Sequence, residues 1–401
     1  MDETDAEGYL VGPGGVLEYD YRPPERPVAS ASLKVLQWNV ERNYESQRIM
    51  DTIKELDPDV CVLQEVDIGC RRSDGRNHMK ELCKELQMYG VFVCEFWELA
   101  SPLRKERDQG GGIHGNAILS KYDMRTRVLN HHVQPYDWDN EGAALGEPRK
   151  GRRFTLAATV QPGTHHAVLL YNVHLEASIA VFTGIIGRVS AFSEILEDAR
   201  EQTEATPHQG IFGDLNTMGH SIARLSSKYA RDRYRWLSLG WTEAEWWNQQ
   251  VLAWHDQDGP VNLGLLTVQG CVWWLKPLAW SLRFLVNHRF SRTWGQSLGQ
   301  VLSGFSWEVL CRARNPGFFD PWPSHHVTLH NPAYFGLFRA KLDWTLVRNL
   351  VVQQRWVGNQ DYSASDHQWL MVELDTSKVI PQDGLERRHQ WQASRTYWAK
   401  S

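Results

Sequence analysis

Apolar and polar residues follow a regular pattern from residue 33 to residue 375. Residues 33–40 alternate as in an extended chain and predict a strand that is buried on at least one face. Residues 46–56 carry apolar side chains on one helical stripe, and Pro58 predicts where this helix stops. Residues 59–66 form a continuous apolar run, which is typical of a strand covered on both faces. The pattern therefore predicts a β-α-β order at the start of the domain.

The same pattern continues toward the C-terminus and predicts a layered α/β sandwich, because strands and helices keep alternating. The further elements that it predicts are a helix over residues 78–88, a strand over 91–97, a glycine-rich turn that runs into a strand ending at 120, a hairpin formed by 152–160 and 167–175, a helix over 183–201, a strand that starts at 210, and strands over 341–347 and 368–374.

Polar side chains stand where the predicted strands end or begin. An apolar run ends on Asp214, and Asn216 lies two positions further on, so both would project from the same face. A carboxylate beside a carboxamide suits the activation of a water molecule, whereas the alternative interpretation is an Asx-turn at a strand end. This stretch alone leaves both interpretations open. The other polar residues at strand ends or entries are Asn39, Glu65, His174, Asp343, Asp366 and His367.

The carboxylates of this set need a compensating charge. Burying an ionised carboxylate is unfavourable unless a cation or hydrogen bonds offset the charge. A hard divalent ion does so, and oxygen ligands without a thiolate favour Mg²⁺ or Mn²⁺ over Zn²⁺. A lone histidine at a strand end, by contrast, is more often structural than catalytic.

Tryptophan is concentrated between residues 220 and 340, which we interpret as an insertion or lid within a single domain spanning residues 33–375. Within it, residues 271–286 predict a short amphipathic helix that could contact a membrane interface, although packing over the core or the site is the alternative. The acidic and Gly/Pro-containing residues 1–32 predict a flexible leader, and residues 376–401 predict a polar tail.

The overall composition is that of a globular protein, with 401 residues, 42% apolar and 23% charged. A net charge of -5 argues against a generally basic, nucleic-acid-coating surface and leaves a local basic groove open. The six cysteines include no CxxC pair and predict reduced thiols. The start of the sequence has no signal-peptide pattern, and no apolar run reaches the roughly 18–20 residues of a membrane span. We therefore expect an intracellular protein, cytoplasmic or nuclear.

The sequence resembles the endonuclease/exonuclease/phosphatase superfamily, which has the deoxyribonuclease-I-like fold. The resemblance covers roughly residues 33–374 apart from the Trp-rich insertion, and it implies a two-layered β-sandwich flanked by helices with the site at one edge. Its motifs, in order, are QWN ending at Asn39, LQEV around Glu65, GNAILS at 115–120, NVHLE around His174, GDLN at 213–216, LDW around Asp343 and SDH at 365–367.

The resemblance implies a magnesium centre, with Mn²⁺ as the alternative ion. Glu65 would be the principal metal ligand, and Asn39 and Asp366 would assist it.

The resemblance also implies roles for the remaining residues in the hydrolysis of a phosphate ester. Asp214 would orient or deprotonate the attacking water, and Asn216 would fix its geometry. His367, oriented by Asp343, would donate to the phosphoryl oxygens. His174 would supply a second contact to the phosphate.

These residues predict a Mg²⁺-dependent phosphoesterase, that is, a nuclease, phosphatase or phosphodiesterase. The substrate would be a nucleic acid, a phospholipid head group or a small phosphate ester, because the shared motifs do not distinguish these classes. The alternative is a non-catalytic member of the fold that binds a partner through the Trp-rich insertion. The complete polar set favours the enzyme, since a binding module has no use for a costly carboxylate cluster.

Overall fold

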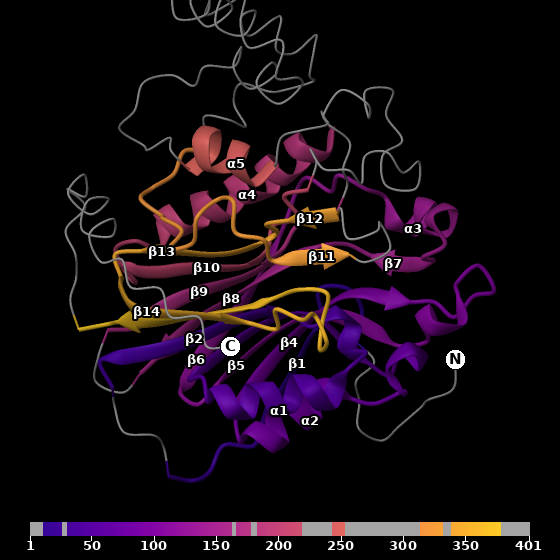
Figure 1. Cartoon of the computed structure of the whole chain (residues 1–401), viewed down its shortest axis with the longest axis horizontal. Helices are drawn as coiled ribbons and strands as arrows, with labels where there is room; N and C mark the ends of the chain where they lie inside the picture. The colour runs from indigo at the N-terminus through magenta and orange to yellow at the C-terminus, as the bar shows by residue number, and fades with distance from the viewer. Residues whose placement is uncertain are drawn as a thin grey trace, which may run out of the picture.

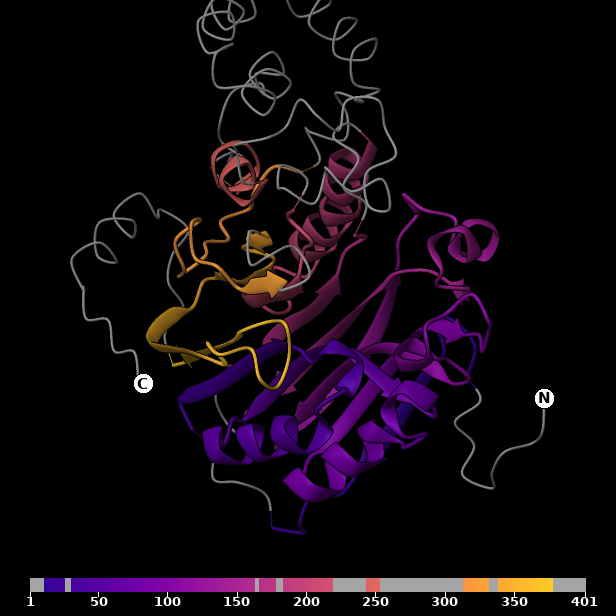
Figure 2. The ribbon, with the colours of Figure 1, turned by 45° about the vertical axis from the view of Figure 1, so that its right-hand side comes forward.

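The computed structural model describes residues 11–25, 30–162, 166–177, 183–218, 243–252, 313–331 and 338–377. Two mixed β-sheets lie face to face, and helices cover the outer face of each sheet (Figures 1 and 2). Helices α1 (Ser46–Leu56) and α2 (His78–Leu86) lie on one side, and α4 (Thr183–Glu201) and α5 (Glu243–Trp247) lie on the other.

The larger sheet has eight strands and the smaller sheet has five. The larger sheet has the order β1 (Val16–Asp20), β4 (Tyr89–Glu98), β5 (Ile113–Ser120), β3 (Val60–Ile68), β2 (Ser32–Asn39), β15 (Trp369–Asp375) and β14 (Val351–Gly358), with β7 (Arg149–Gly151) paired to β4. The smaller sheet has the order β13 (Asp343–Arg348), β10 (His208–Asp214), β9 (Val168–His174), β8 (Phe154–Gln161) and β6 (Asp123–Asn130). Three short elements complete the set of labelled strands and helices: the paired strands β11 (Leu329–Asn331) and β12 (Phe338–Ala340) and the helix α3 (Trp138–Glu141).

Three apolar clusters hold these four layers together. The first lies between the sheets and includes Val62 and Phe212. The second joins the larger sheet to the helices that carry Ile49 and Met79, and the third joins the smaller sheet to α4 through residues such as Phe192. The predicted two-layered β-sandwich flanked by helices is therefore confirmed.

Each sheet contains one parallel pair, and a helix connects the two strands of that pair. Strands β2 and β3 are parallel and joined by α1, and β9 and β10 are parallel and joined by α4. Parallel neighbours need such a crossover because both strands run in the same direction. The bounds predicted for α1 and α4 are confirmed.

The prediction of a leader over residues 1–32 is wrong for residues 16–20. These residues form β1, which pairs with β4 at the edge of the larger sheet. Strands β6 and β14, which end their sheets, were also missed. Edge strands are half-solvated and therefore lack a clear apolar alternation, so their pairing partner decides their conformation.

Most of the Trp-rich segment lies outside the described residues, and so do residues 271–286 with their predicted membrane contact, residues 1–10 and most of the predicted tail. Two described parts of this segment pack on the domain. Trp247 of α5 stacks edge-on against Phe192 of α4, with ring centroids 5.2 Å apart. Residues 313–331 run beside β13, where Thr328 Oγ1 accepts the backbone N–H of Asp343.

Two further findings concern the described residues only. The cysteines described there are buried free thiols: Cys61, Cys70, Cys83 and Cys94. None of the helices in this part of the chain is both long enough and apolar enough to cross a membrane.

Candidate active site

Strand topology brings the predicted polar residues to one edge of the sandwich. The parallel pair β9 and β10 ends with His174 opposite Asp214. Strand β13 is antiparallel to β10 and begins there, so Asp343 also lies opposite Asp214. Asn39 ends β2 in the other sheet, and its side chain reaches Asp214 across the sandwich. The predicted convergence of these strand ends is therefore observed.

Glu65 lies at a bulge and not at a strand end. Strand β3 continues to Ile68, and its register with β5 shifts between Leu63 and Val66. Glu65 adopts a φ of 62°, which is uncommon for a residue with a Cβ atom. A bulge bends the strand and redirects a side chain. The bulge therefore turns the Glu65 carboxylate toward the edge where Asn39 and Asp214 meet.

Asn39 connects two carboxylates in this structure. Its Nδ2 donates to Glu65 Oε1 at 3.2 Å and to Asp214 Oδ2 at 3.1 Å. Its Oδ1 accepts the backbone N–H of Glu41 at 3.1 Å. In this orientation the amide oxygen faces the Glu41 backbone. The predicted role of Asn39 as a metal ligand stays a prediction.

His367 is paired with a carboxylate that holds it as a cation. Its Nδ1–H donates to Asp343 Oδ2 at 2.8 Å, and its Nε2 lies 3.8 Å from Asp214 Oδ2 and 3.8 Å from Asp366 Oδ1. Burial alone would lower the pKa of His367, but the hydrogen-bonded charge of Asp343 raises this pKa well above its usual value. His367 therefore presents a charged Nε2–H beside Asp214.

His174 is held in the opposite state. Arg153 Nη1 donates to His174 Nδ1 at 2.9 Å, and a guanidinium has no acceptor, so the ring proton sits on Nε2. Burial and the charge of Arg153 lower the pKa of His174 well below its usual value. Its Nε2–H faces Asp214 Oδ2 at 3.7 Å and Glu65 Oε1 at 3.9 Å. His174 is therefore a neutral donor at the same edge.

The stretch after β10 forms an Asx-turn, as one of the two interpretations of its sequence predicted. Asp214 Oδ1 accepts the backbone N–H of Asn216 at 2.7 Å. Asn216 has a φ of 50°, and its Nδ2 donates to the carbonyl of Leu175 at 2.8 Å. These bonds tie the turn after β10 to the turn after β9. A role of Asn216 in positioning water stays a prediction.

A buried amide network beneath the site was missed by the sequence reasoning. Gln37 Nε2 donates to Asp343 Oδ1 and to Gln64 Oε1, each at 2.9 Å. Gln64 Nε2 donates to Asn172 Oδ1 at 2.8 Å, across the space between the two sheets. Each of these three amides lies inside an apolar strand, one or two positions before a candidate site residue. This pattern was the signal that could have identified them. The network fixes the carboxylate that orients His367.

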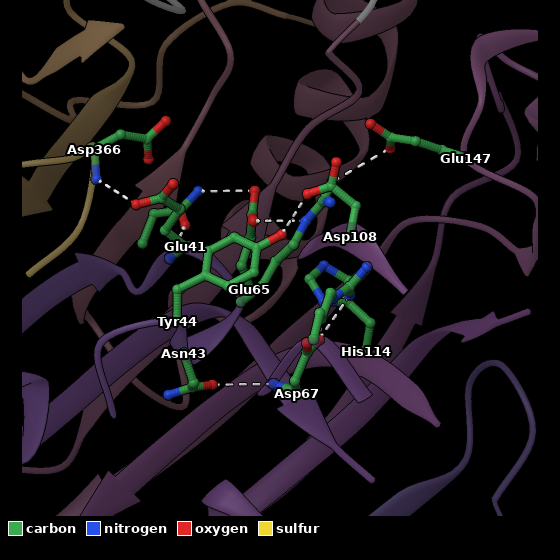
Figure 3. A network of polar contacts seen from close by, with 12 residues as sticks. Glu41, Asn43, Tyr44, Glu65, Asp67, Asp108, His114, Glu147 and Asp366 are labelled. Carbon is green, nitrogen blue, oxygen red and sulfur yellow. Dashed lines mark hydrogen bonds and ion pairs between the residues drawn. The ribbon is translucent and has the colours of Figure 1, made fainter. Parts of the chain in front are cut away.

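Glu41 was also missed, although it lies in a cluster of carboxylates at the site. Its Oε2 accepts the backbone N–H of Asp366 at 2.9 Å (Figure 3). Burial and the charge of Asp366 raise the pKa of Glu41 to about 7. Burial also raises the pKa of Asp214 to about 7, with Asp343 adding to the shift, and raises the pKa of Asp366 to about 6, with Glu65 adding to it.

These raised pKa values arise mainly from burial, and repulsion between the carboxylates adds to them. A hard divalent cation would stabilise the ionised form of the carboxylates that bind it, and the donors available are carboxylate and amide oxygens. The donor chemistry therefore fits such an ion. However, within the described part of the chain, no three Asp, Glu, His or Cys side chains are arranged closely enough to form a metal site. The predicted ligand set of Glu65, Asn39 and Asp366 consists of two carboxylates and one amide, and it stays a prediction.

A four-layer sandwich with its polar residues at one edge defines the class of the fold as deoxyribonuclease-I-like. A family model described as the Endonuclease/Exonuclease/phosphatase family matches residues 36–367. The chain belongs to this family of phosphoesterases. No curated protein matches the chain in sequence.

Solved structures of this fold are similar to the chain at low identity. A family protein from Beutenbergia cavernae DSM 12333 is 15% identical, with 87% of this chain and 72% of that chain covered and a TM-score of 0.46. The 3' phosphatase NExo from Neisseria, solved with a product DNA hairpin, is 15% identical, with 86% and 99% covered and a TM-score of 0.43. A humanized D. rerio TDP2 is 12% identical, with 86% and 100% covered and a TM-score of 0.42. The family assignment rests on the match over residues 36–367.

Proposed function

We propose that this protein is a Mg²⁺-dependent phosphoesterase that hydrolyses a phosphodiester or phosphomonoester with water. The observation that supports the proposal is the pairing of one carboxylate, Asp214, with two imidazole donors of different charge. Asp214 Oδ2 lies 3.7 Å from His174 Nε2 and 3.8 Å from His367 Nε2. Attack of water at phosphorus needs a base and donors for the phosphoryl oxygens, and this edge contains both.

Asp214 is proposed as the base that orients and deprotonates the attacking water. A base works best when its pKa is close to the pH of the reaction, and burial raises the pKa of Asp214 to about 7. Asn39 Nδ2 and the backbone N–H of Asn216 both donate to this carboxylate. They therefore hold the carboxylate in one orientation, as a positioned base requires.

The two histidines are proposed to bind the phosphoryl group. His367, held charged by Asp343, would donate from Nε2 to a phosphoryl oxygen, and His174 would donate from its neutral ring to another. When a divalent cation is bound, with Glu65 as a ligand and Glu41 or Asp366 beside it, it would neutralise negative charge on the phosphate. The substrate is proposed to be a nucleic acid, a phospholipid head group or a small phosphate ester.

The proposal is tested by hydrolysis of a chromogenic phosphodiester. We expect turnover in Mg²⁺, none in excess chelator, and recovery when Mg²⁺ is restored. Asp214→Asn should lower kcat by about 10³-fold, because removal of a general base costs roughly 10²–10⁴. The matched control is Asp51→Asn on α1, whose carboxylate accepts from Gln47 at an exposed position.

Two results would contradict the proposal. One is full turnover by Asp214→Asn. The other is no hydrolysis, with or without Mg²⁺, of the chromogenic ester, single-stranded DNA, RNA, sphingomyelin vesicles or phosphoinositides. The second result would favour the non-catalytic alternative. A positive result with one member of this panel would identify the substrate class.

A further inference from the structure

Three consecutive residues beside the site adopt a left-handed backbone. Glu41, Arg42 and Asn43 have φ values of 43°, 60° and 55°. Such values are unfavourable for residues with a Cβ atom, and a run of three is rare. A strained segment of this kind persists only when its surroundings hold it, and such segments cluster at functional sites.

Side-chain hydrogen bonds hold this left-handed turn on each side (Figure 3). The backbone N–H of Glu41 donates to Asn39 Oδ1, and the carboxylate of Glu41 accepts the backbone N–H of Asp366. On the other side, Asn43 Oδ1 accepts the backbone N–H of Asp67 at 3.0 Å. The turn is therefore anchored to β2, to β3 and to the segment before β15.

The anchored turn places the Arg42 guanidinium between two carboxylates. Its Nε lies 3.7 Å from Glu65 Oε2, and its Nη2 lies 3.3 Å from Glu147 Oε2. The Arg42 side chain is only 17% exposed. Burial alone would raise the pKa of Glu65, but neighbouring charges, of which Arg42 is the strongest, lower it. Arg42 is thus the main cation that now offsets the charge of Glu65.

We propose that Arg42 is an internal counter-ion for Glu65 that a divalent cation has to displace. The inference rests on the proposed function, in which Glu65 binds that cation. A guanidinium and a divalent ion on the same carboxylate repel each other, so binding of the ion is favoured when the guanidinium moves away. Glu147 Oε2 already accepts from Arg42 Nη2 at 3.3 Å, so it offers the guanidinium a second carboxylate in this exchange. Arg42 therefore holds Glu65 charged and oriented before the cation arrives, and it weakens the binding of that cation.

The inference is tested by Mn²⁺ binding to the full chain without substrate. The electron paramagnetic resonance signal of free Mn²⁺ measures how much of the ion remains unbound. Arg42→Gln should bind Mn²⁺ about tenfold more tightly than the wild type, a coupling of ordinary size. The matched control is Arg107→Gln, because Arg107 is an exposed cation that lies 3.8 Å from Glu41 and is paired with that carboxylate. This variant should change the Kd by less than about twofold.

Further variants make the result decisive. Arg42→Lys keeps the positive charge and replaces Arg42→Gln in the test if that variant does not fold. It should also bind Mn²⁺ more tightly than the wild type, because an ammonium lacks the fork that spans both carboxylates. The inference is overturned if neither Arg42 variant binds Mn²⁺ more tightly than the wild type, or if Arg107→Gln gains as much. Glu65→Gln distinguishes a failure of the proposed function, in which Glu65 binds the metal, from a failure of the counter-ion inference. Mn²⁺ binding that persists unchanged in Glu65→Gln contradicts the proposed metal ligand itself, whereas binding that needs Glu65 but ignores Arg42 contradicts only the counter-ion.

Discussion

At the scale of single residues, partners and not residue type determine the charge states at this edge. His367 and His174 both face Asp214, yet the charge of Asp343 keeps the first cationic, whereas burial and the charge of Arg153 keep the second neutral. An imidazole titrates near neutral pH, so one adjacent charge is enough to select its state. The site therefore combines a charged donor and a neutral donor, and both are histidine side chains.

The carboxylate cluster leads to a prediction about pH. In the folded protein the pKa of Glu41 is raised from 4.5 to about 7, so between these values the folded state holds a proton that the unfolded state releases. Raising the pH through this window therefore favours unfolding. Without divalent cations, Glu41→Gln should become more stable relative to wild type as the pH rises from about 5 to about 8, by about 2 °C or more in Tm.

The measurement is thermal unfolding in chelator at several pH values. Asp51→Asn removes an exposed carboxylate, and its Tm is expected to change with pH in parallel with the Tm of the wild type. A constant difference in Tm between Glu41→Gln and wild type across this range would show that Glu41 does not carry the raised pKa.

At the scale of elements, close approach of two strands sets the distance between site residues. Gly213 in β10 has a φ of 147°, and a Cβ atom there would lie 1.8 Å from the carbonyl oxygen of Val173 in β9. Only glycine lets the two backbones approach in this way. The next pair along these strands is Asp214 with His174, so this contact keeps the two groups together.

A buried ion pair joins α5 to α4 and leads to a stability prediction. Arg188 Nε donates to Glu243 Oε1 at 3.0 Å, and neither residue is exposed to solvent. Arg188→Met would leave the Glu243 charge buried without its cation, so the free energy of unfolding should fall by about 3–5 kcal/mol. The control is Arg127→Met, which breaks the partly exposed pair with Asp198 and should cost about 0–1 kcal/mol.

Denaturant unfolding of the two variants compares these costs directly. Combining Arg188→Met with Glu243→Met should recover much of the loss, because no uncompensated charge remains. Equal losses of unfolding free energy in the Arg188 and Arg127 variants would mean that the pair of Arg188 with Glu243 does not anchor α5.

At the scale of the whole molecule, the site depends on how the two sheets pack. The larger sheet supplies Asn39 and Glu65, and the smaller sheet supplies His174, Asp214 and Asp343. The apolar cluster between the sheets holds these two groups against each other. Neither sheet contains the site alone.

Strand β1 completes the larger sheet, and its removal gives a prediction for the whole domain. A chain that starts at residue 21 lacks β1 and leaves residues 89–93 of β4 unpaired at that edge, whereas a chain that starts at residue 11 keeps the pairing of Val16 with Val93. An unpaired edge promotes association with other chains. We expect the shorter chain to scatter light on concentration and to unfold at a lower temperature, and identical behaviour of the two chains would contradict this.

The sequence by itself determined the order of the main strands and helices and the eight candidate site residues. This worked because apolar periodicity acts over a few residues, as in α1, and because a polar residue at a strand end, such as Asp214, is a local signal.

Only the tertiary structure decided the edge strand β1, the bulge at Glu65, the direction of the Asn39 amide and the position of Arg42 beside Glu65. Each of these depends on partners far along the chain: β1 on β4, Glu65 on the register with β5, and Arg42 on Glu147. A local pattern contains no information about such partners, because their conformations become favourable only once the distant segments have paired and packed.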